Sequence, residues 1–219
     1  MSTLTTHQEH LEEILNALSH GVGAALALAG LTALVITSYI YGTIWHQVSF
    51  IIYGVSLFLL YLASTLYHSF KNERLKYIFK ICDHSAIYLL IAGSYTPFAL
   101  VLFRGVLGWT IFGIVWSLAA IGVILKIFFV KKFKVISTLC YLGMGWLAII
   151  FIKPLLAALP VTGLYWLIAG GLSYTIGAVF YLCRQLPYNH TVWHFFVIAG
   201  SACHFITILF FVLPIATPA

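Results

Sequence analysis

The chain has 219 residues, of which 63% are hydrophobic and only 7% are charged. A mean hydropathy of +1.06 lies far outside the range of soluble domains, which excludes a water-soluble globular protein. The net charge of +6 comes from lysines and arginines that flank apolar segments, where anionic lipid headgroups attract them. The sequence contains no nucleic-acid-binding motif. We therefore predict an integral membrane protein whose partners are membrane lipids and not nucleic acids.

Seven apolar segments are each long enough to cross the hydrocarbon core of a bilayer as a helix of about 20 residues. Glycine, proline and charged residues separate them. The predicted spans are Leu18–Tyr41, Val48–Phe70, Ile78–Phe103, Val106–Val130, Val135–Ile152, Thr162–Cys183 and His190–Leu213. We thus expect an all-α protein in which residues 18–213 form a seven-helix transmembrane domain, with short tails at 1–17 and 214–219.

The positive residues predict how these helices are oriented. Only Arg104 and Lys153 flank the spans on one side of the membrane. Nine others lie on the opposite side: Lys71, Arg74, Lys76, Lys80, Lys126, Lys131, Lys132, Lys134 and Arg184. The positive-inside rule therefore puts the amino terminus in the cytoplasm and the carboxyl terminus outside. The first seventeen residues contain no lysine or arginine, so we do not expect a cleaved secretory signal.

Ionisable and polar residues recur at helical spacing near the ends of three spans. His190 and His194 are four residues apart, so both imidazoles lie on the same face of a helix. Ser64 and His68 repeat that spacing on the second span. Asp83 is the only acidic residue within a predicted span. Because such groups are costly in a membrane, their grouping indicates a functional site.

The predicted topology brings these residues to one depth near the cytoplasmic face. The second span ends near His68, the third begins near Asp83, and the seventh begins at His190. Three neutral imidazoles leave a fourth position open, which is typical of catalytic zinc. Asp83 would then orient or deprotonate water, and Ser64 would hydrogen-bond to Asp83 or to a carbonyl. A single histidine near a helix end is more often interfacial, but the shared depth favours a metal site.

Four other histidines are expected outside this site. His84 points about 100° away from Asp83 on a helix, which predicts a supporting or packing role. His204 lies about 15 Å deeper than His194, too far to share an ion, and is expected to make an interhelical hydrogen bond. His20 is expected at the mouth of the pocket. His46 falls in an outer loop, where we expect it to be exposed to solvent.

Proline and glycine in the spans predict packing features. Pro97 removes a helical hydrogen bond, and we favour a packing bend over a widened cavity above Asp83. Small residues allow close approach of membrane helices. We expect such approach at Gly143, Gly145, Gly170, Gly171 and Gly177.

Four phrases of the chain closely resemble the bacterial hemolysin III family: STLYHS (64–69), DHSAIYLLIAGSYTPF (83–98), YLGMGW (141–146) and NHTVWHFFVIAGSACHF (189–205). That family belongs with the progestin and adiponectin receptors and, more distantly, with the alkaline ceramidases. The resemblance covers nearly all of the chain from His20 onward. It implies a cytoplasmic amino terminus and a zinc ion bound by His68, His190 and His194. It also implies that Asp83 and Ser64 stand beside the zinc site.

The resemblance implies a zinc-dependent hydrolase of lipid amides, with ceramide hydrolysis as the template, or a related role in membrane lipid homeostasis. One alternative is a non-enzymatic sensor or receptor in which zinc only ties helices together. Another is a haem-binding electron carrier, because paired histidines on facing helices also bind iron. The expected location is the cytoplasmic (inner) membrane of a bacterium.

Overall fold

The computed structural model describes residues 5–183 and 185–213, and the regular secondary structure in these residues is entirely helical. Within the described residues, seven helical segments are long and apolar enough to cross a membrane, as the sequence predicted. Their bounds are His7–Tyr41, Ile44–Ser69, Glu73–Phe103, Gly105–Phe129, Lys134–Ala158, Val161–Leu182 and Asn189–Val212. The chain is therefore a multi-pass membrane protein.

Four of the spans are single α-helices and three change pitch along their length. The single helices are α1 (Thr6–Tyr41), α2 (Ile44–Ser69), α4 (Gly105–Phe129) and α7 (Val161–Leu182). The third and seventh spans end in π-helical turns, namely α3 (Glu73–Pro97) with η1 (Phe98–Phe103) and α8 (Asn189–Thr207) with η3 (Ile208–Val212). The fifth span consists of α5 (Lys134–Gly145), the 3₁₀-helical η2 (Trp146–Phe151) and α6 (Ile152–Ala158).

The first helix begins well before the apolar span predicted for it. Thr5 and Gln8 form a capping box, in which each side chain accepts a hydrogen bond from the other residue's backbone N–H. Residues that we assigned to a tail are therefore helical from Thr6 onward and continuous with the span. The predicted tail at 214–219, and Arg184 among the orienting residues, lie outside the described residues.

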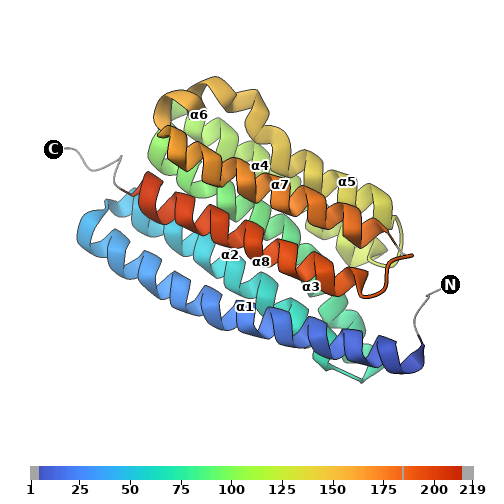
Figure 1. Ribbon diagram of the computed structural model, residues 1–219. Helices are drawn as coiled ribbons and strands as arrows, with labels where there is room; N and C mark the ends of the chain where they lie inside the picture. The colour runs from blue at the N-terminus through green and yellow to red at the C-terminus, as the bar shows by residue number, and fades with distance from the viewer. Residues whose placement is uncertain (1–4, 184, 214–219) are drawn as a thin grey trace.

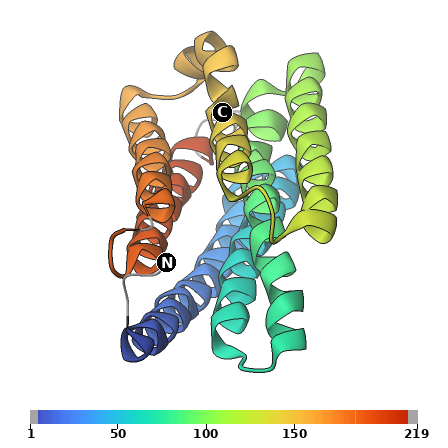
Figure 2. The same cartoon turned by 90° about the vertical axis from the view of Figure 1, so that its right-hand side faces the viewer.

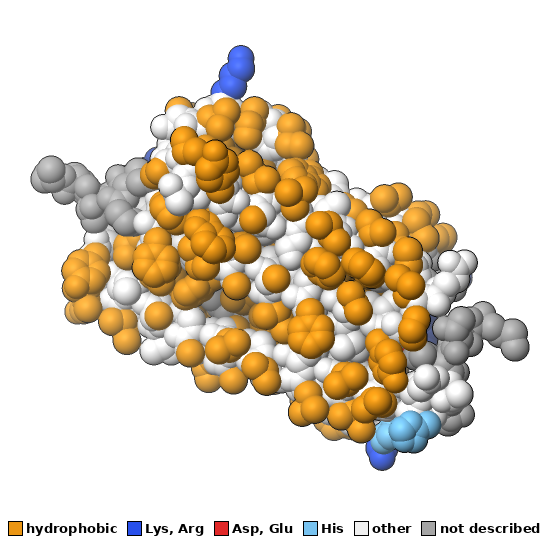
Figure 3. Space-filling view, viewed as in Figure 1, with side chains coloured by type: hydrophobic (Ala, Val, Ile, Leu, Met, Phe, Trp, Pro, Cys, Tyr) orange, Lys and Arg blue, Asp and Glu red, His pale blue; other side chains and the backbone are white. Residues whose placement is uncertain are grey.

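The helices form a bundle in which α1 to α4 pack in chain order, α7 packs against α8, and α8 returns to α1 (Figure 1). Helix α5 packs against α3 and α7 and not closely against α4, its neighbour in the sequence. Helix α1 begins at the end of the bundle opposite the end of η3, as an odd number of spans requires. Seen from the end where α1 begins, α5 lies between α7 and α4 (Figure 2). Hydrophobic side chains cover most of the face shown in Figure 3, which suits contact with lipid chains.

Only some of the glycines allow the close helix approach that we predicted. A Cβ at Gly177 would lie 2.6 Å from the Cβ of Phe196, so α7 and α8 are in tight contact there. Gly170 similarly faces the ring of His204. The prediction was wrong for Gly143 and Gly145, where a Cβ would meet no described atom within 4 Å. Helix α5 is therefore loosely packed along this side.

The predicted bend at Pro97 coincides with a change of helix type. Directly after Pro97, α3 passes into the π-helical turn η1. Proline cannot donate the backbone hydrogen bond that an α-helix needs, and π-helical turns are a common adjustment in such helices. Just before Pro97, Thr96 donates a hydrogen bond from its Oγ1 to the carbonyl of Ala92 at 2.9 Å, a contact that often accompanies a helix bend.

Candidate metal centre

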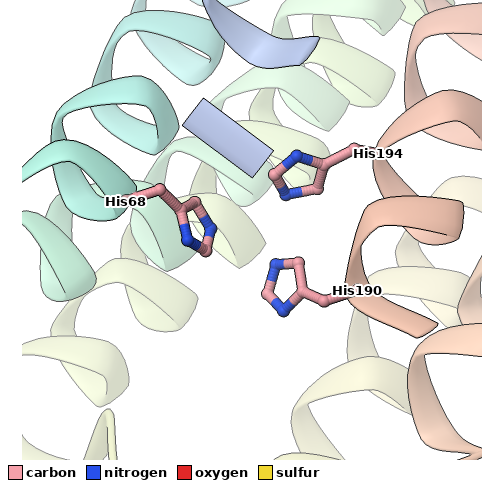
Figure 4. A group of neighbouring side chains, drawn as sticks. All are labelled: His68, His190 and His194. Atoms are coloured by element: carbon pink, nitrogen blue, oxygen red, sulfur yellow. The ribbon is translucent and has the colours of Figure 1, made fainter. Parts of the chain in front are cut away.

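Three histidines from two helices converge in the interior of the bundle. His68 lies at the end of α2, and His190 and His194 lie on the first turns of α8. One ring nitrogen of each comes within 4.8 Å of the other two, close enough for one ion. The ring centroids are 4.8 to 5.2 Å apart, and the ring planes are inclined by 71 to 79° to one another. Figure 4 shows the three rings pointing toward a common space.

The ring of His68 is held by an acidic side chain from α1. Its Nδ1 lies 3.2 Å from Oε2 of Glu13, and a carboxylate can only accept, so Nδ1 carries the proton. The same oxygen accepts a hydrogen bond from Nζ of Lys76 at 2.7 Å. The other ring nitrogen, Nε2, is buried and has no hydrogen-bond partner among the described residues. This leaves the lone pair of Nε2 for a ligand.

The ring of His194 is held in the same way by a serine. Its Nδ1 lies 3.1 Å from Oγ of Ser19, whose own hydroxyl donates to the carbonyl of Asn16 at 3.0 Å. With the Ser19 hydrogen on that carbonyl, we assign Nδ1 of His194 as the donor of the other hydrogen bond. His68, and by this assignment His194, carries its proton on Nδ1, which leaves the lone pair of Nε2 for a metal ion.

The same stretch of α1 also fixes the beginning of α8. Oε1 of Glu12 accepts a hydrogen bond from the backbone N–H of His190 at 3.1 Å, a favourable place for a carboxylate because helix N-termini carry unpaired donors. Oγ1 of Thr191 donates to Oδ1 of Asn16 at 2.7 Å. Sequence reasoning missed these α1 residues, although Glu12, Asn16 and Ser19 recur at spacings of four and three, a polar stripe on one helix face.

His20 stands next to the cluster but is not one of its converging ligands. Its ring stacks on that of His194, with centroids 3.5 Å apart and planes inclined by 6°. The lone pairs of the two stacked rings lie in nearly parallel planes and do not converge on one point, and His20 is not among the converging ligands of the described residues. Both ring nitrogens of His20 are buried without a hydrogen-bond partner among the described residues. His20 also lines the adjacent cavity, as the sequence predicted.

The structure places Asp83 and Ser64 beside the cluster, lining the same cavity as His190 and His194. Asp83 is not among the ligands that converge with the histidines in the described part of the chain. Its Oδ2 lies 3.7 Å from Nδ1 of His84, which itself donates to the carbonyl of Lys80 at 2.8 Å. The hydroxyl of Ser64 is buried, close to the carboxylate of Asp83 but without a hydrogen-bond partner within 3.5 Å among the described residues. Both groups are thus available to a molecule in the cavity.

Two histidines that we expected outside the site, His46 and His204, lie in different surroundings. The prediction that His46 is exposed was wrong, because its side chain is completely buried. Its Nδ1 accepts a hydrogen bond from the backbone N–H of Thr43 at 3.0 Å, and this caps the start of α2. His204 lines the cavity deeper in the bundle and packs against Tyr174, with ring centroids 5.4 Å apart. It is not part of the converging cluster.

A cavity of about 400 Å³ adjoins the cluster and lies mainly between α3, α5, α7 and α8. Its lining on the third span runs from Lys80, one turn before Asp83, past Tyr95 to Phe98 at the start of η1, about 27 Å of helical rise. Away from Asp83 and the histidines, the walls of the cavity are mostly aliphatic and aromatic. Gly145 lies in this lining, next to the open space already noted along α5.

The fold and site define a seven-helix membrane protein with a histidine cluster that could hold a metal ion and an apolar cavity beside it. The Haemolysin-III related family model matches residues 8–205, and the chain belongs to this family.

Relatives in bacteria and animals agree with this assignment. The chain is 53% identical to Hemolysin-3 of Bacillus cereus over 206 residues, which cover 94% of each chain. It is 51% identical to a Hemolysin-3 homolog of Bacillus subtilis (strain 168), over 91% of this chain and 94% of the relative. It is also 33% identical to the human Monocyte to macrophage differentiation factor, over 75% and 70% of the two chains. The resemblance seen in the sequence phrases is thus confirmed.

Proposed function

We propose that the protein is a zinc-dependent membrane hydrolase that cleaves lipid amides. The observation that carries the proposal is the convergence of His68, His190 and His194, two of which have the proton held on Nδ1 by α1. Neutral imidazoles directed in this way form the donor set of catalytic zinc sites, which use three protein ligands and keep one position open. The buried and unpartnered Nε2 of His68 fits such an ion.

When bound, zinc supplies Lewis acidity that polarises a carbonyl group and acidifies water. The chain's own residues would do the rest. In amide hydrolysis, water adds to the carbonyl carbon, the C–N bond breaks, and the nitrogen leaves with a proton as an amine. The carboxylate of Asp83 is the group that takes a proton from water and returns it to the nitrogen. The buried hydroxyl of Ser64, which lies close to Asp83, would donate a hydrogen bond to the carbonyl oxygen.

The apolar part of the cavity explains why the substrate would be a lipid. Its walls of Leu90, Ile91, Phe98 and Leu155 exclude water and suit an acyl chain. A chain with seven apolar helices is suited to remain in the membrane of its own cell. The Bacillus relatives support a bacterial membrane, and we propose that it is the cytoplasmic (inner) membrane. We therefore interpret the protein as a resident lipid enzyme and not as a secreted lytic protein.

Two measurements on the purified protein test this function. Metal analysis should find about one zinc per chain in the wild type, and His190→Ala should lose it while remaining folded. A panel of N-acyl lipids, including ceramide, should be cleaved by the wild type and not by Asp83→Asn. Zinc without turnover of any lipid would support the sensor or receptor instead. A folded wild-type protein without zinc, or one with the Soret band of haem, would overturn the proposal.

A further inference from the structure

The end of the cavity nearest Asp83 is lined by four lysines, namely Lys80, Lys126, Lys131 and Lys134. They come from the second turn of α3, the last turns of α4, the α4–α5 connection and the first residue of α5. Asp83 is the only acidic residue among the described residues of the lining. Four lysines and one aspartate thus line this end of the cavity, which would hold a lipid under the proposed function.

Lys126 is the most informative of the four because its side chain is only 4% exposed. Its Nζ donates a hydrogen bond to Oγ of Ser137 at 2.7 Å and lies 5.6 Å from the centroid of the Tyr141 ring. An ammonium group has three N–H donors, and within the described residues no carboxylate lies within 4.0 Å of this one. A buried ammonium without an anion is costly, so its position indicates a negatively charged ligand.

The other lysines surround the same space. Nζ of Lys131 lies 5.0 Å from the centroid of the Tyr77 ring, and Lys80 is half-buried on α3. Lys134 is anchored by a hydrogen bond from its Nζ to the carbonyl of Tyr181 at 2.8 Å. The nearby carboxylate of Glu13 is already bound to His68 and Lys76 and does not line the cavity. Because Asp83 is the one acidic residue in the described lining and Lys126 has no carboxylate beside it, this end favours a ligand that brings its own anion.

The positive-inside rule alone does not explain this arrangement. Lysines that follow that rule extend outward to the lipid headgroups of the surrounding bilayer, as exposed Lys71 and Lys132 are free to do. Lys126 is instead buried and lines the cavity. A phosphate group suits several ammonium groups at once, because it keeps its charge at neutral pH and offers several acceptor oxygens.

The position of the lysines relative to Asp83 also suits a lipid. Lys80 and Asp83 are one helical turn apart on α3, about 4.5 Å in rise, while Phe98 lies more than 20 Å further along the same wall. Tyr141 joins the two parts of the site, since its hydroxyl donates to the carbonyl of His84 at 2.9 Å and its ring faces Lys126. A phosphate at the lysines would leave an adjacent amide near Asp83 and the acyl chain along the apolar wall.

We propose that Lys80, Lys126, Lys131 and Lys134 form a headgroup subsite that binds the phosphate of an anionic lipid. The binding of an anionic lipid is argued from the cavity and its lysines alone. That this lipid is also the substrate rests on the proposed hydrolase function, and it narrows the substrate to phosphate-bearing N-acyl lipids.

Binding to a matched pair of lipids tests the subsite without any need for turnover. Ceramide 1-phosphate and ceramide differ only in the phosphate, and native mass spectrometry of the purified full-length protein measures the affinity for each. The wild type should bind the phosphate form at least tenfold more tightly. Lys126→Gln should bind ceramide 1-phosphate about tenfold more weakly than the wild type, as expected for the loss of one charged hydrogen-bonding partner. Its affinity for ceramide should be unchanged.

Control variants keep the result interpretable. Lys132→Gln alters an exposed lysine of the same connection that does not line the cavity, so the preference should be retained. If Lys126→Gln fails to fold, Lys131→Gln, at an exposed position, serves in its place with a smaller expected loss. Equal wild-type affinity for the two lipids, or an equal loss in Lys132→Gln, would overturn the subsite. So would thermal stabilisation by inorganic phosphate equal to that by ceramide 1-phosphate, because the ligand would then be the free anion.

These outcomes are separate from those of the hydrolase test. A tenfold preference for the phosphate form, lost in Lys126→Gln, would support the subsite even if neither lipid is cleaved, and in that case only the hydrolase proposal fails. Cleavage of both lipids without any binding preference would overturn the subsite and leave the hydrolase intact.

Discussion

Replacement of Glu13 by alanine tests whether α1 prepares the histidine cluster for a metal ion. The carboxylate accepts the hydrogen bond from Nδ1 of His68 at 3.2 Å, and without it the ring is free to rotate or to carry its proton on Nε2. Loss of such a supporting partner typically lowers metal affinity by 10- to 100-fold, or about 1.4 to 2.7 kcal/mol. The Glu13 side chain is 36% exposed, so water screens part of its charge, and we expect the lower end, about tenfold.

The affinity is measured by competition between the metal-depleted protein and a fluorescent zinc chelator. Glu13→Gln retains an acceptor oxygen and should lose less than Glu13→Ala. Glu73→Ala, an exposed acidic residue at the start of α3, is the control and should bind zinc as the wild type does. In a His68→Ala background, Glu13→Ala should cause no further loss. An unchanged affinity in Glu13→Ala, or an equal loss with His68 absent, would refute the reasoning.

Three further results are expected. Ser19→Ala removes the acceptor of His194 Nδ1 and should weaken zinc binding several-fold in the same competition assay; wild-type affinity would contradict the proton assignment on His194. Gly177→Ala places a Cβ 2.6 Å from that of Phe196 and should destabilise the protein by about 1 to 3 kcal/mol. Gly113→Ala should be neutral, because its Cβ would meet no described atom within 4 Å beyond its own helix backbone, and equal melting temperatures of the two variants in detergent would count against this packing. Chelation of zinc should lower the melting temperature, and zinc but not magnesium should restore it, because imidazole ligands suit zinc; restoration by magnesium would argue against a histidine site.

Features set by backbone geometry and local composition could be predicted from the sequence. The length of each apolar segment determines whether it spans the bilayer, and the seven spans are confirmed. The four-residue spacing of His190 and His194 places both on one face of a helix wherever that helix packs. Because successive spans run in opposite directions, the sequence also predicted His68 at the same depth as His190 and His194, and the three rings do meet. None of these inferences requires knowledge of which helices are neighbours.

The rest depended on which helices pack together, and only the tertiary structure decided it. Glu13 and Ser19 became partners of His68 and His194 because α1 lies against α2 and α8, a contact that its own sequence does not encode. Lys126 follows the positive-inside pattern like any other lysine, and only the tertiary structure shows that it is buried, hydrogen-bonded to Ser137 of α5 and part of the cavity lining. A helix specifies its faces by its periodicity, but what each face meets is chosen by the bundle as a whole.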